Sequence, residues 1–172
     1  MLNMADIYSD EIKRLQASVK NASFQSNEDV RQFIYDLTKL IYDFKMIGLI
    51  YDYYARDVEY HKQNKVLFRD VEDVVRNVAE FEAAFPNLRT NIESIIVYKE
   101  NENFYKVSKR LHYWGNNYGV GKFGVATGKS LANNCMSMSI LHLKNTEDGW
   151  KITFEINSDS EAWLEEVQRP DR

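Results

Sequence analysis

Apolar residues recur at helical spacing in three segments of the N-terminal half of the chain. They do so over 4–20, again after Ser26 or Asn27, and again from 71 to 85. A serine or asparagine before acidic residues is a typical helix start, because its side chain accepts a hydrogen bond from a free amide of the first turn. Pro86 ends the third segment. This pattern predicts three main helices.

The C-terminal half changes to strand-like patterning. Residues 57–61 form a short alternating segment, and longer segments rich in β-branched and aromatic residues follow at 88–99, 104–117, 131–144 and 150–157. Polar, turn-forming residues separate the long segments, so consecutive hairpins and an antiparallel sheet are expected. Helices packed on one face of such a sheet make an α+β fold with a concave pocket.

The composition fits a single domain over 1–172 and argues against some classes of binding partner. The chain is 44% hydrophobic, which is enough for a sizeable core, and its net charge of -4 argues against a nucleic-acid-binding surface. No apolar run approaches the roughly 20 residues that span a bilayer, so we expect no membrane segment. The single cysteine and the absence of a signal-peptide pattern predict a cytoplasmic protein.

Two glycine-rich segments resemble nucleotide-binding motifs in sequence. Residues 119–124 match the dinucleotide fingerprint, and residues 124–130 resemble a phosphate-binding loop that is one residue short. Both motifs need a helix whose N-terminus receives the phosphate, whereas a strand is predicted to follow here. We therefore expect no nucleotide cofactor.

A metal site is also not expected. His61, His112 and His142 are the only histidines, no two are closely spaced, and Cys135 lies inside a predicted strand. Zinc sites need several such ligands that converge, and a thiol within a strand is more often inert than reactive.

Alternation along the strands selects the first candidate site residues. Arg110, His112 and Trp114 share one face of the second long strand, which either lines the pocket or is simply solvated. His142 shares its strand face with methionine and isoleucine, so it is either a core histidine or a base within a pocket.

Asp159 ends an alternating series in the last strand, where a carboxylate could overhang the mouth of the pocket. The same residue, or Ser158, could instead cap a short closing helix up to Val167. The residues alone favour the capping role.

Several spaced landmarks together resemble one family, the SnoaL-like polyketide cyclases of the nuclear-transport-factor-two-like superfamily. The landmarks are Ala84-Phe85-Pro86-Asn87, Ile92-Glu93, Arg110, Gly115-Asn116-Asn117, Thr127-Gly128-Lys129 and Asp57-Val58-Glu59-Tyr60-His61. The resemblance implies a cone-shaped α+β barrel over residues 27–168, preceded by an extra helix within 1–22.

By that resemblance, Asp159 matches the aspartate that acts as general base and acid in an intramolecular aldol closure, and His142 matches its helper. No cofactor is implied. The pocket walls are expected at His61, Arg110, His112, Trp114 and Asn117, of which Asn117 stands where the family has a histidine.

Two functions therefore remain open from the sequence. The chain is either an acid/base enzyme acting on a small, partly hydrophobic carbonyl compound, or a non-catalytic ligand-binding or dimerisation module of the same fold. We also expect a homodimer, with an open sheet face and the aromatic residues Tyr98, Tyr105, Tyr113 and Tyr118 as its contact surface.

Overall fold

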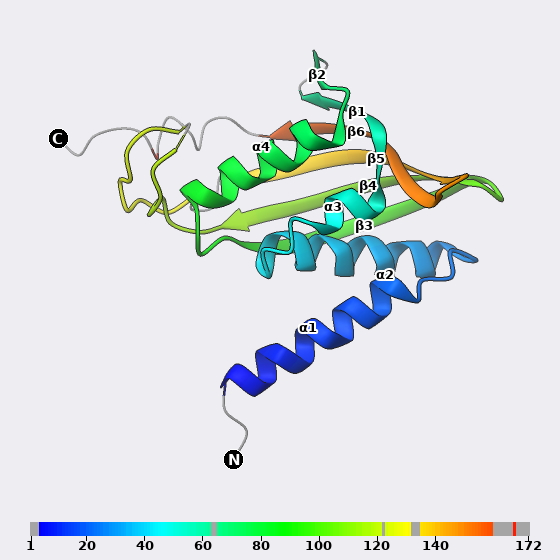
Figure 1. Ribbon diagram of the computed structural model, residues 1–172, viewed down its shortest axis with the longest axis horizontal. Helices are drawn as coiled ribbons and strands as arrows, with labels where there is room; N and C mark the ends of the chain where they lie inside the picture. The colour runs from blue at the N-terminus through cyan, green and yellow to red at the C-terminus, as the bar shows by residue number, and fades with distance from the viewer. Residues whose placement is uncertain (1–3, 63–64, 122, 132–134, 160–166, 168–172) are drawn as a thin grey trace.

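The computed structural model describes residues 4–62, 65–121, 123–131, 135–159 and 167 (Figure 1). Its elements, in chain order, are α1 (Met4–Lys20), α2 (Asn27–Thr38), the π-helix η1 (Lys39–Asp43), α3 (Leu49–Tyr53), β1 (Tyr54–Lys62), β2 (Lys65–Phe68), α4 (Val71–Ala84), β3 (Arg89–Asn101), β4 (Phe104–Trp114), β5 (Met136–Thr146) and β6 (Gly149–Asp159). The three predicted helices are confirmed, and β2 is an additional strand.

Local sequence explains where the main helices begin. The Ser26 side chain accepts a hydrogen bond from the amide of Asp29, and the Asp29 carboxylate accepts one from the amide of Ser26, which completes a capping box at the start of α2. Asp70 caps α4 by accepting a hydrogen bond from the amide of Glu72.

The sheet has the strand order β2-β1-β6-β5-β4-β3. All neighbouring strands are antiparallel except β1 and β6, which run parallel. The expectation of a purely antiparallel sheet was therefore wrong at this pair. After β2 the chain continues through α4 to the far edge of the sheet at β3, and the hairpins that follow bring β6 back beside β1.

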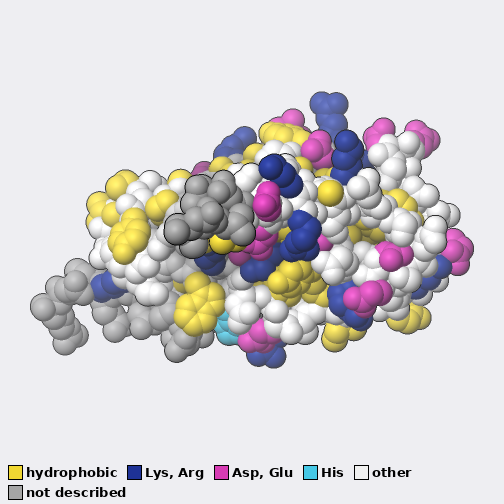
Figure 2. All heavy atoms as spheres, turned by 90° about the horizontal axis from the view of Figure 1, so that it is seen from below, with side chains coloured by type: hydrophobic (Ala, Val, Ile, Leu, Met, Phe, Trp, Pro, Cys, Tyr) yellow, Lys and Arg dark blue, Asp and Glu magenta, His cyan; other side chains and the backbone are white. Residues whose placement is uncertain are grey.

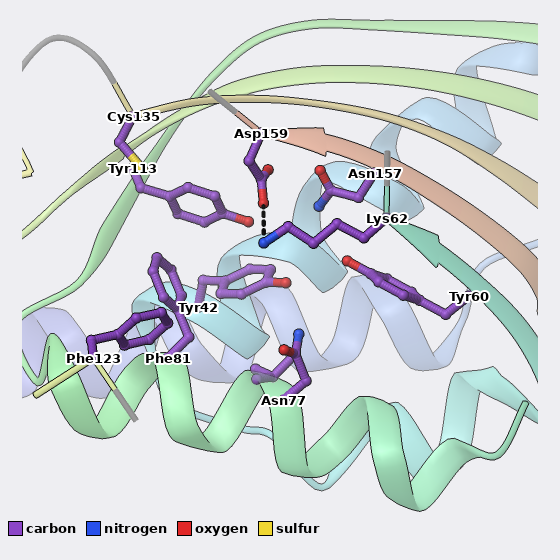
Figure 3. Close-up of a pocket in the computed structure, with 11 residues that line it drawn as sticks. Tyr42, Tyr60, Lys62, Asn77, Phe81, Tyr113, Phe123, Cys135, Asn157 and Asp159 are labelled. Atoms are coloured by element: carbon purple, nitrogen blue, oxygen red, sulfur yellow. Dashed lines mark ion pairs between the residues drawn. The ribbon is translucent and has the colours of Figure 1, made fainter. Parts of the chain in front are cut away.

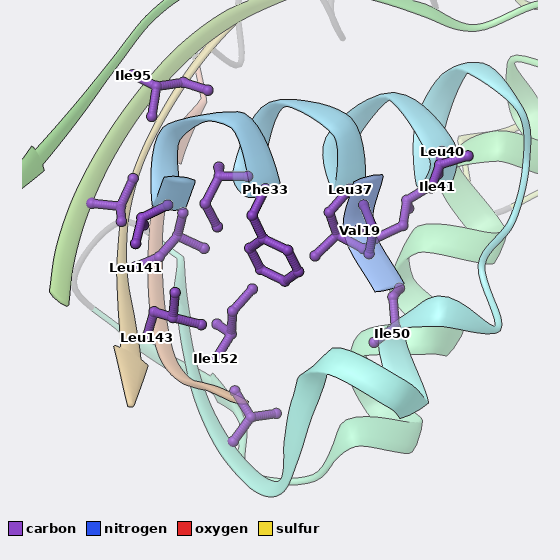
Figure 4. Close-up of a cluster of buried hydrophobic side chains, with 14 of the residues drawn as sticks. Val19, Phe33, Leu37, Leu40, Ile41, Ile50, Ile95, Leu141, Leu143 and Ile152 are labelled. Atoms are coloured by element: carbon purple, nitrogen blue, oxygen red, sulfur yellow. The ribbon is translucent and has the colours of Figure 1, made fainter. Parts of the chain in front are cut away.

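The helices and the curved sheet enclose the core (Figure 1). Helix α2 packs on β3, α4 packs on β1 and β2, and α1 lies against the other side of α2. Phe33 and Leu37 of α2 lie in one buried cluster with Leu141, Leu143 and Ile152 of the sheet (Figure 4). This arrangement confirms the α+β fold with helices on one face of a curved sheet.

A second buried cluster lies near the C-terminal end of α4. Its members are Ala84, Phe85, Leu88, Leu111, Tyr113, Leu131, Cys135 and Val167. The predicted closing helix over 158–167 was wrong at its start, because Ser158 and Asp159 belong to β6; residues 160–166 lie outside the described residues, and Val167 is buried in this cluster.

Surface charges of both signs are interspersed on the face that Figure 2 shows, with apolar side chains between them. Within the described parts of the chain, none of the helices is long and apolar enough to cross a bilayer.

Candidate functional site

A pocket opens between α4 and the inner face of the sheet, close to where β1 and β6 end (Figure 3). It holds about 550 Å³, its open mouth included. Its lining comes from six segments far apart in the sequence: Tyr42, Tyr60, Lys62, Asn77, Val78, Phe81, Tyr113, Phe123, Cys135, Asn157 and Asp159.

Tyr42 reaches the pocket from η1, which widens the turn at the end of α2. The π-helix is held by Asp43, whose Oδ1 accepts hydrogen bonds from the amide and the hydroxyl of Thr90, both at 2.7 Å. Lys39 Nζ lies 2.8 Å from Asp43 Oδ2. Single π-helical turns are frequent at functional sites, and this one carries a pocket side chain.

The polar wall comes from the alternation of the strands. Asn157 and Asp159 lie two residues apart on the inner face of β6, and Tyr60 and Lys62 do the same on β1. Lys62 Nζ lies 3.8 Å from Asp159 Oδ2, and Figure 3 shows both side chains directed into the pocket. The site thus places a carboxylate beside a cation.

Three phenols face this ion pair, and all remain protonated over the neutral pH range. Burial raises the pKa of Tyr42, Tyr60 and Tyr113, and nearby Glu155 raises the first two further. Tyr42 and Tyr113 share a hydrogen bond, and Tyr60 shares one with Asn157. Neutral phenols are hydrogen-bond donors, so this wall can bind a carbonyl or enolate oxygen.

The remaining wall is aromatic and apolar. Phe81 of α4 lies edge-on to Tyr113, with ring centroids 5.2 Å apart, and to Phe123, at 6.1 Å. Phe123 comes from the connection between β4 and β5, so this long loop contributes to the pocket directly. A concave apolar site with a few convergent polar groups is typical of small-molecule binding.

Among the sequence-predicted catalytic residues, Asp159 lies in the pocket and His142 does not. His142 stacks on Phe154, with ring centroids 4.6 Å apart, on the outer face of the sheet. Asp159 instead lies opposite Ser137, whose side chain is buried on the inner face. The sheet lies between His142 and Asp159, so the expected pairing of these two residues was wrong. The residue beside Asp159 is Lys62 instead.

The expected walls His61, Arg110, His112 and Trp114 also lie on the outer face. Arg110 and His112 both contact Glu93, each at 2.6 Å, while Leu111 and Tyr113 occupy the buried side of the same strand. The grouping by alternation was right, but the apolar face of β4 is the one that faces the helices. His61 contacts Glu59 and the ring of Phe154.

Asn117 is buried but does not line the pocket. Its Nδ2 donates to the carbonyl oxygen of Ala84 at 3.2 Å, and its Oδ1 accepts from the amide of Thr127 at 2.9 Å. These bonds fasten the β4–β5 loop to the end of α4. Asn117 therefore holds in place the loop that carries Phe123.

Sequence reasoning missed Tyr42, Tyr60, Lys62 and Tyr113. The alternation of Tyr60 with Lys62 around His61 was a usable signal, because choosing the opposite face of β1 selects both residues. No sequence pattern indicated Tyr42, because its side chain would point in a different direction if the helix were a regular α-helix. For the residues that the structure describes, no group of three or more His, Cys, Asp or Glu side chains could hold a metal ion.

Comparison with known proteins finds similarity in structure alone. No family model matches the sequence, and no curated protein matches it either. An NTF2-like protein with a cystatin-like fold from Novosphingobium aromaticivorans shares 12% identity, with a TM-score of 0.57, over 94% of this chain and 93% of that one.

Two further solved structures bear names that suggest different chemistry. One, described as a SnoaL-like polyketide cyclase from Jannaschia sp. CCS1, has 11% identity and a TM-score of 0.57 over 80% of this chain and 92% of its own. The other, described as a scytalone dehydratase from Novosphingobium aromaticivorans, has 8% identity and a TM-score of 0.56 over 88% and 87%. The expected structural resemblance is confirmed: this chain has the cystatin-like, nuclear-transport-factor-two-like fold that SnoaL-like polyketide cyclases also have.

Proposed function

We propose that the pocket binds a small, partly hydrophobic, carbonyl-bearing molecule and that Asp159 is the acid/base group acting on it. The observation that carries the proposal is the Lys62–Asp159 pair at 3.8 Å, set into a pocket whose other walls are phenols and phenylalanines. Apolar walls bind the carbon skeleton, and the polar wall orients the oxygen atoms.

The chemistry that suits this arrangement is enolisation followed by ring closure or isomerisation. The Asp159 carboxylate removes a proton from the carbon beside the carbonyl, and the electron pair moves to the carbonyl oxygen. A phenol of Tyr60 or Tyr113 stabilises the resulting enolate by donating a hydrogen bond. The enolate carbon then attacks a second carbonyl of the same molecule or is reprotonated, and Asp159 returns the proton. The overall reaction involves no oxidation or reduction.

The alternative is a ligand-binding module without turnover. The same pocket would bind the same class of molecule, and Asp159 would then serve as a polar anchor. The fold alone does not choose between the two, because it hosts many unrelated activities.

Asp159→Asn separates the two functions. Native mass spectrometry of protein purified from its own host identifies a retained molecule, and incubation follows its conversion. We expect wild type to consume the compound, while Asp159→Asn retains it unchanged. Asp148→Asn, which makes the same change at an exposed turn, should behave as wild type. Equal retention without conversion in all three proteins would favour the binding module.

We also propose that a second copy of the chain covers the outer face of the sheet. Ile96, Ser108, Ile140 and Ile156 form one cross-strand row there, and Ile96 and Ile140 are 66% and 47% exposed. Ion pairs flank the row, Arg110 with Glu93 and Lys106 with Glu100. Since both signs of charge lie beside one apolar row, the surface can pair with itself about a twofold axis.

The contact surface expected from the sequence needs one correction. Tyr98 and Tyr118 are 62% and 60% exposed, but Tyr105 and Tyr113 are buried in the core. Sedimentation velocity at micromolar concentration should show a dimer that Ile140→Lys dissociates. A wild-type monomer, or a dimer that Ile140→Lys leaves intact, would contradict this interface.

A further inference from the structure

Lys109 is a buried lysine on the inner face of β4. Only 8% of it is exposed. In the described part of the chain, one hydrogen-bond acceptor lies within reach of its Nζ: the hydroxyl of Thr38, at 3.5 Å. That hydroxyl donates its own proton to the carbonyl oxygen of Ile34 at 2.7 Å, so it can offer Lys109 only this one long contact, whereas the ammonium group has three donors. Lys109 therefore has hydrogen-bonding capacity that the described protein groups leave largely unused.

A small inner cavity adjoins this lysine. Lys109, Thr38, Tyr54 and Tyr42 contribute its polar lining, and aliphatic side chains of η1, α2 and the sheet complete it. Tyr42 lines both this cavity and the main pocket, so one phenol ring lies between the two spaces.

Strand register connects Lys109 to the main pocket. Lys109 lies opposite Ser139, Ser139 opposite Asn157, and Asn157 opposite Lys62, so a single row of polar residues crosses four strands. The row begins and ends with a lysine. At about 4.8 Å per strand step, the two lysine backbones are roughly 14 Å apart along the row. Ser139 is 3% exposed, and its hydroxyl lacks a hydrogen-bond partner among the described residues.

The local electrostatics are consistent with a site that receives an anionic oxygen. Burial lowers the pKa of Lys109, while Glu155 and then Asp159 raise it from a distance. None of the carboxylates in the described residues lies within 4.0 Å of its Nζ, and the Glu155 carboxylate accepts a hydrogen bond from Tyr54 at 2.8 Å. A buried cation without a close counterion interacts strongly with an oxygen that carries negative charge.

We propose that Lys109, with Ser139, forms an inner oxygen-binding subsite that is reached past Tyr42. This subsite binds one terminal oxygen of the ligand. That oxygen is either a carbonyl oxygen that becomes an enolate oxygen during the reaction or a phenolate oxygen. This inference rests on the proposed function and narrows its substrate class: an elongated molecule with oxygen groups at both ends, one beside Lys62 and Asp159 and the other beside Lys109.

The test uses 2-naphthol as a probe that forms an oxygen anion and naphthalene as its matched apolar control. Probe fluorescence gives both affinities, and the absorption spectrum of the bound probe reports whether 2-naphthol is ionised. In Lys109→Met we expect 2-naphthol affinity to fall by about ten- to a hundredfold, the usual effect of losing a hydrogen bond to a charged group, with naphthalene affinity retained. The ionisation signal of the bound probe should disappear as well.

One control variant and one stability measurement locate the effect. Lys106→Met removes an exposed lysine from the outer face of the same strand and should leave both affinities unchanged. Lys109→Met should also unfold at the same or a higher temperature than wild type, because replacing a buried charge with an apolar side chain of similar size is often neutral or stabilising.

The outcomes distinguish the subsite from the pocket itself. If wild type binds both probes and Lys109→Met changes neither affinity, the role of Lys109 is overturned and the pocket remains. The role of Lys109 is also overturned, and the pocket remains, if 2-naphthol affinity falls in Lys62→Met but not in Lys109→Met. If wild type binds neither probe, the proposed function and the subsite are both overturned.

Discussion

Lys62 on β1 and Asp159 on β6 face each other inside the pocket, with 3.8 Å between Nζ and Oδ2. The parallel pairing of these strands brings them together, because Lys62 lies opposite Asn157, two residues before Asp159. The other side chains that line the pocket surround this pair. Three phenols supply hydrogen-bond donors on one side, and the phenylalanines of α4 and the β4–β5 loop form an apolar wall on the other.

The Lys62–Asp159 pair should contribute little to stability. The two side chains are 37% and 20% exposed, and exposed ion pairs contribute up to about 1 kcal/mol. In a double-mutant cycle of Lys62→Met and Asp159→Asn followed by urea unfolding, we expect a coupling free energy below about 1 kcal/mol. A coupling above about 2 kcal/mol would show that the pair serves the fold rather than the pocket.

Glu82 should make stability depend on pH near neutrality. It is 5% exposed, and burial raises its pKa to about 7, although Lys45 opposes this shift. Between pH 4.5 and 7 the folded state holds a proton that the unfolded state has lost, so this contribution to stability falls as the pH rises through that window.

Glu82→Gln tests this effect. We expect the variant to match wild type near pH 4 and to be about 1–3 kcal/mol more stable at pH 8, as measured by urea unfolding. Glu147→Gln, at an exposed turn, should track wild type at both pH values. Equal stability of Glu82→Gln and wild type at pH 8 would contradict the raised pKa.

Gly119 allows the β4–β5 loop to approach α4 closely. A Cβ at this position would lie 1.7 Å from the carbonyl oxygen of Ala83, and the Gly119 amide donates to the carbonyl oxygen of Ala84 at 3.1 Å. Because backbone atoms would have to move, Gly119→Ala should lower the free energy of unfolding by about 1–3 kcal/mol. Gly121→Ala is the matched control, since nothing lies within 4 Å of its added Cβ; equal losses would refute the close approach.

Cys135 should be unreactive in the folded protein. It is 2% exposed, and burial, followed by the charge of Asp159, raises the pKa of its thiol. Because the thiolate is the nucleophile, we expect a thiol reagent such as DTNB to label it only after denaturation. Stoichiometric labelling of native protein within minutes would show that this wall of the pocket opens.

His142 should be dispensable for the pocket. Burial lowers the pKa of its imidazole, and Lys144 and Lys106 lower it further, so the ring is neutral at pH 7. NMR titration should therefore give a pKa below 6.5. His142→Gln should leave retention and conversion of the ligand unchanged, and a loss of conversion comparable to that of Asp159→Asn would restore the partnership expected from the sequence.

Local patterns in the sequence were sufficient for the three main helices and the long strands, but not for β2 or the π-helical turn η1. Helical spacing and caps located α1, α2 and α4, because capping and amphipathicity act within a few residues of each other. Alternation likewise grouped Arg110 with His112 and Trp114 correctly. It did not show which face of β4 was buried, because that depends on where α2 and α4 pack.

The sequence by itself determined the class of fold and the membership of each strand face, since both follow from the period of the apolar residues. Tertiary structure decided which residues meet. It put β1 parallel to β6, which gave Asp159 the lysine Lys62 as its neighbour and left His142 on the far face of the sheet. It also turned Tyr42 into the pocket through a π-helix held by Asp43 and Thr90. Contacts of this kind join segments far apart in the chain, and their geometry depends on the packing of the whole molecule rather than on local spacing.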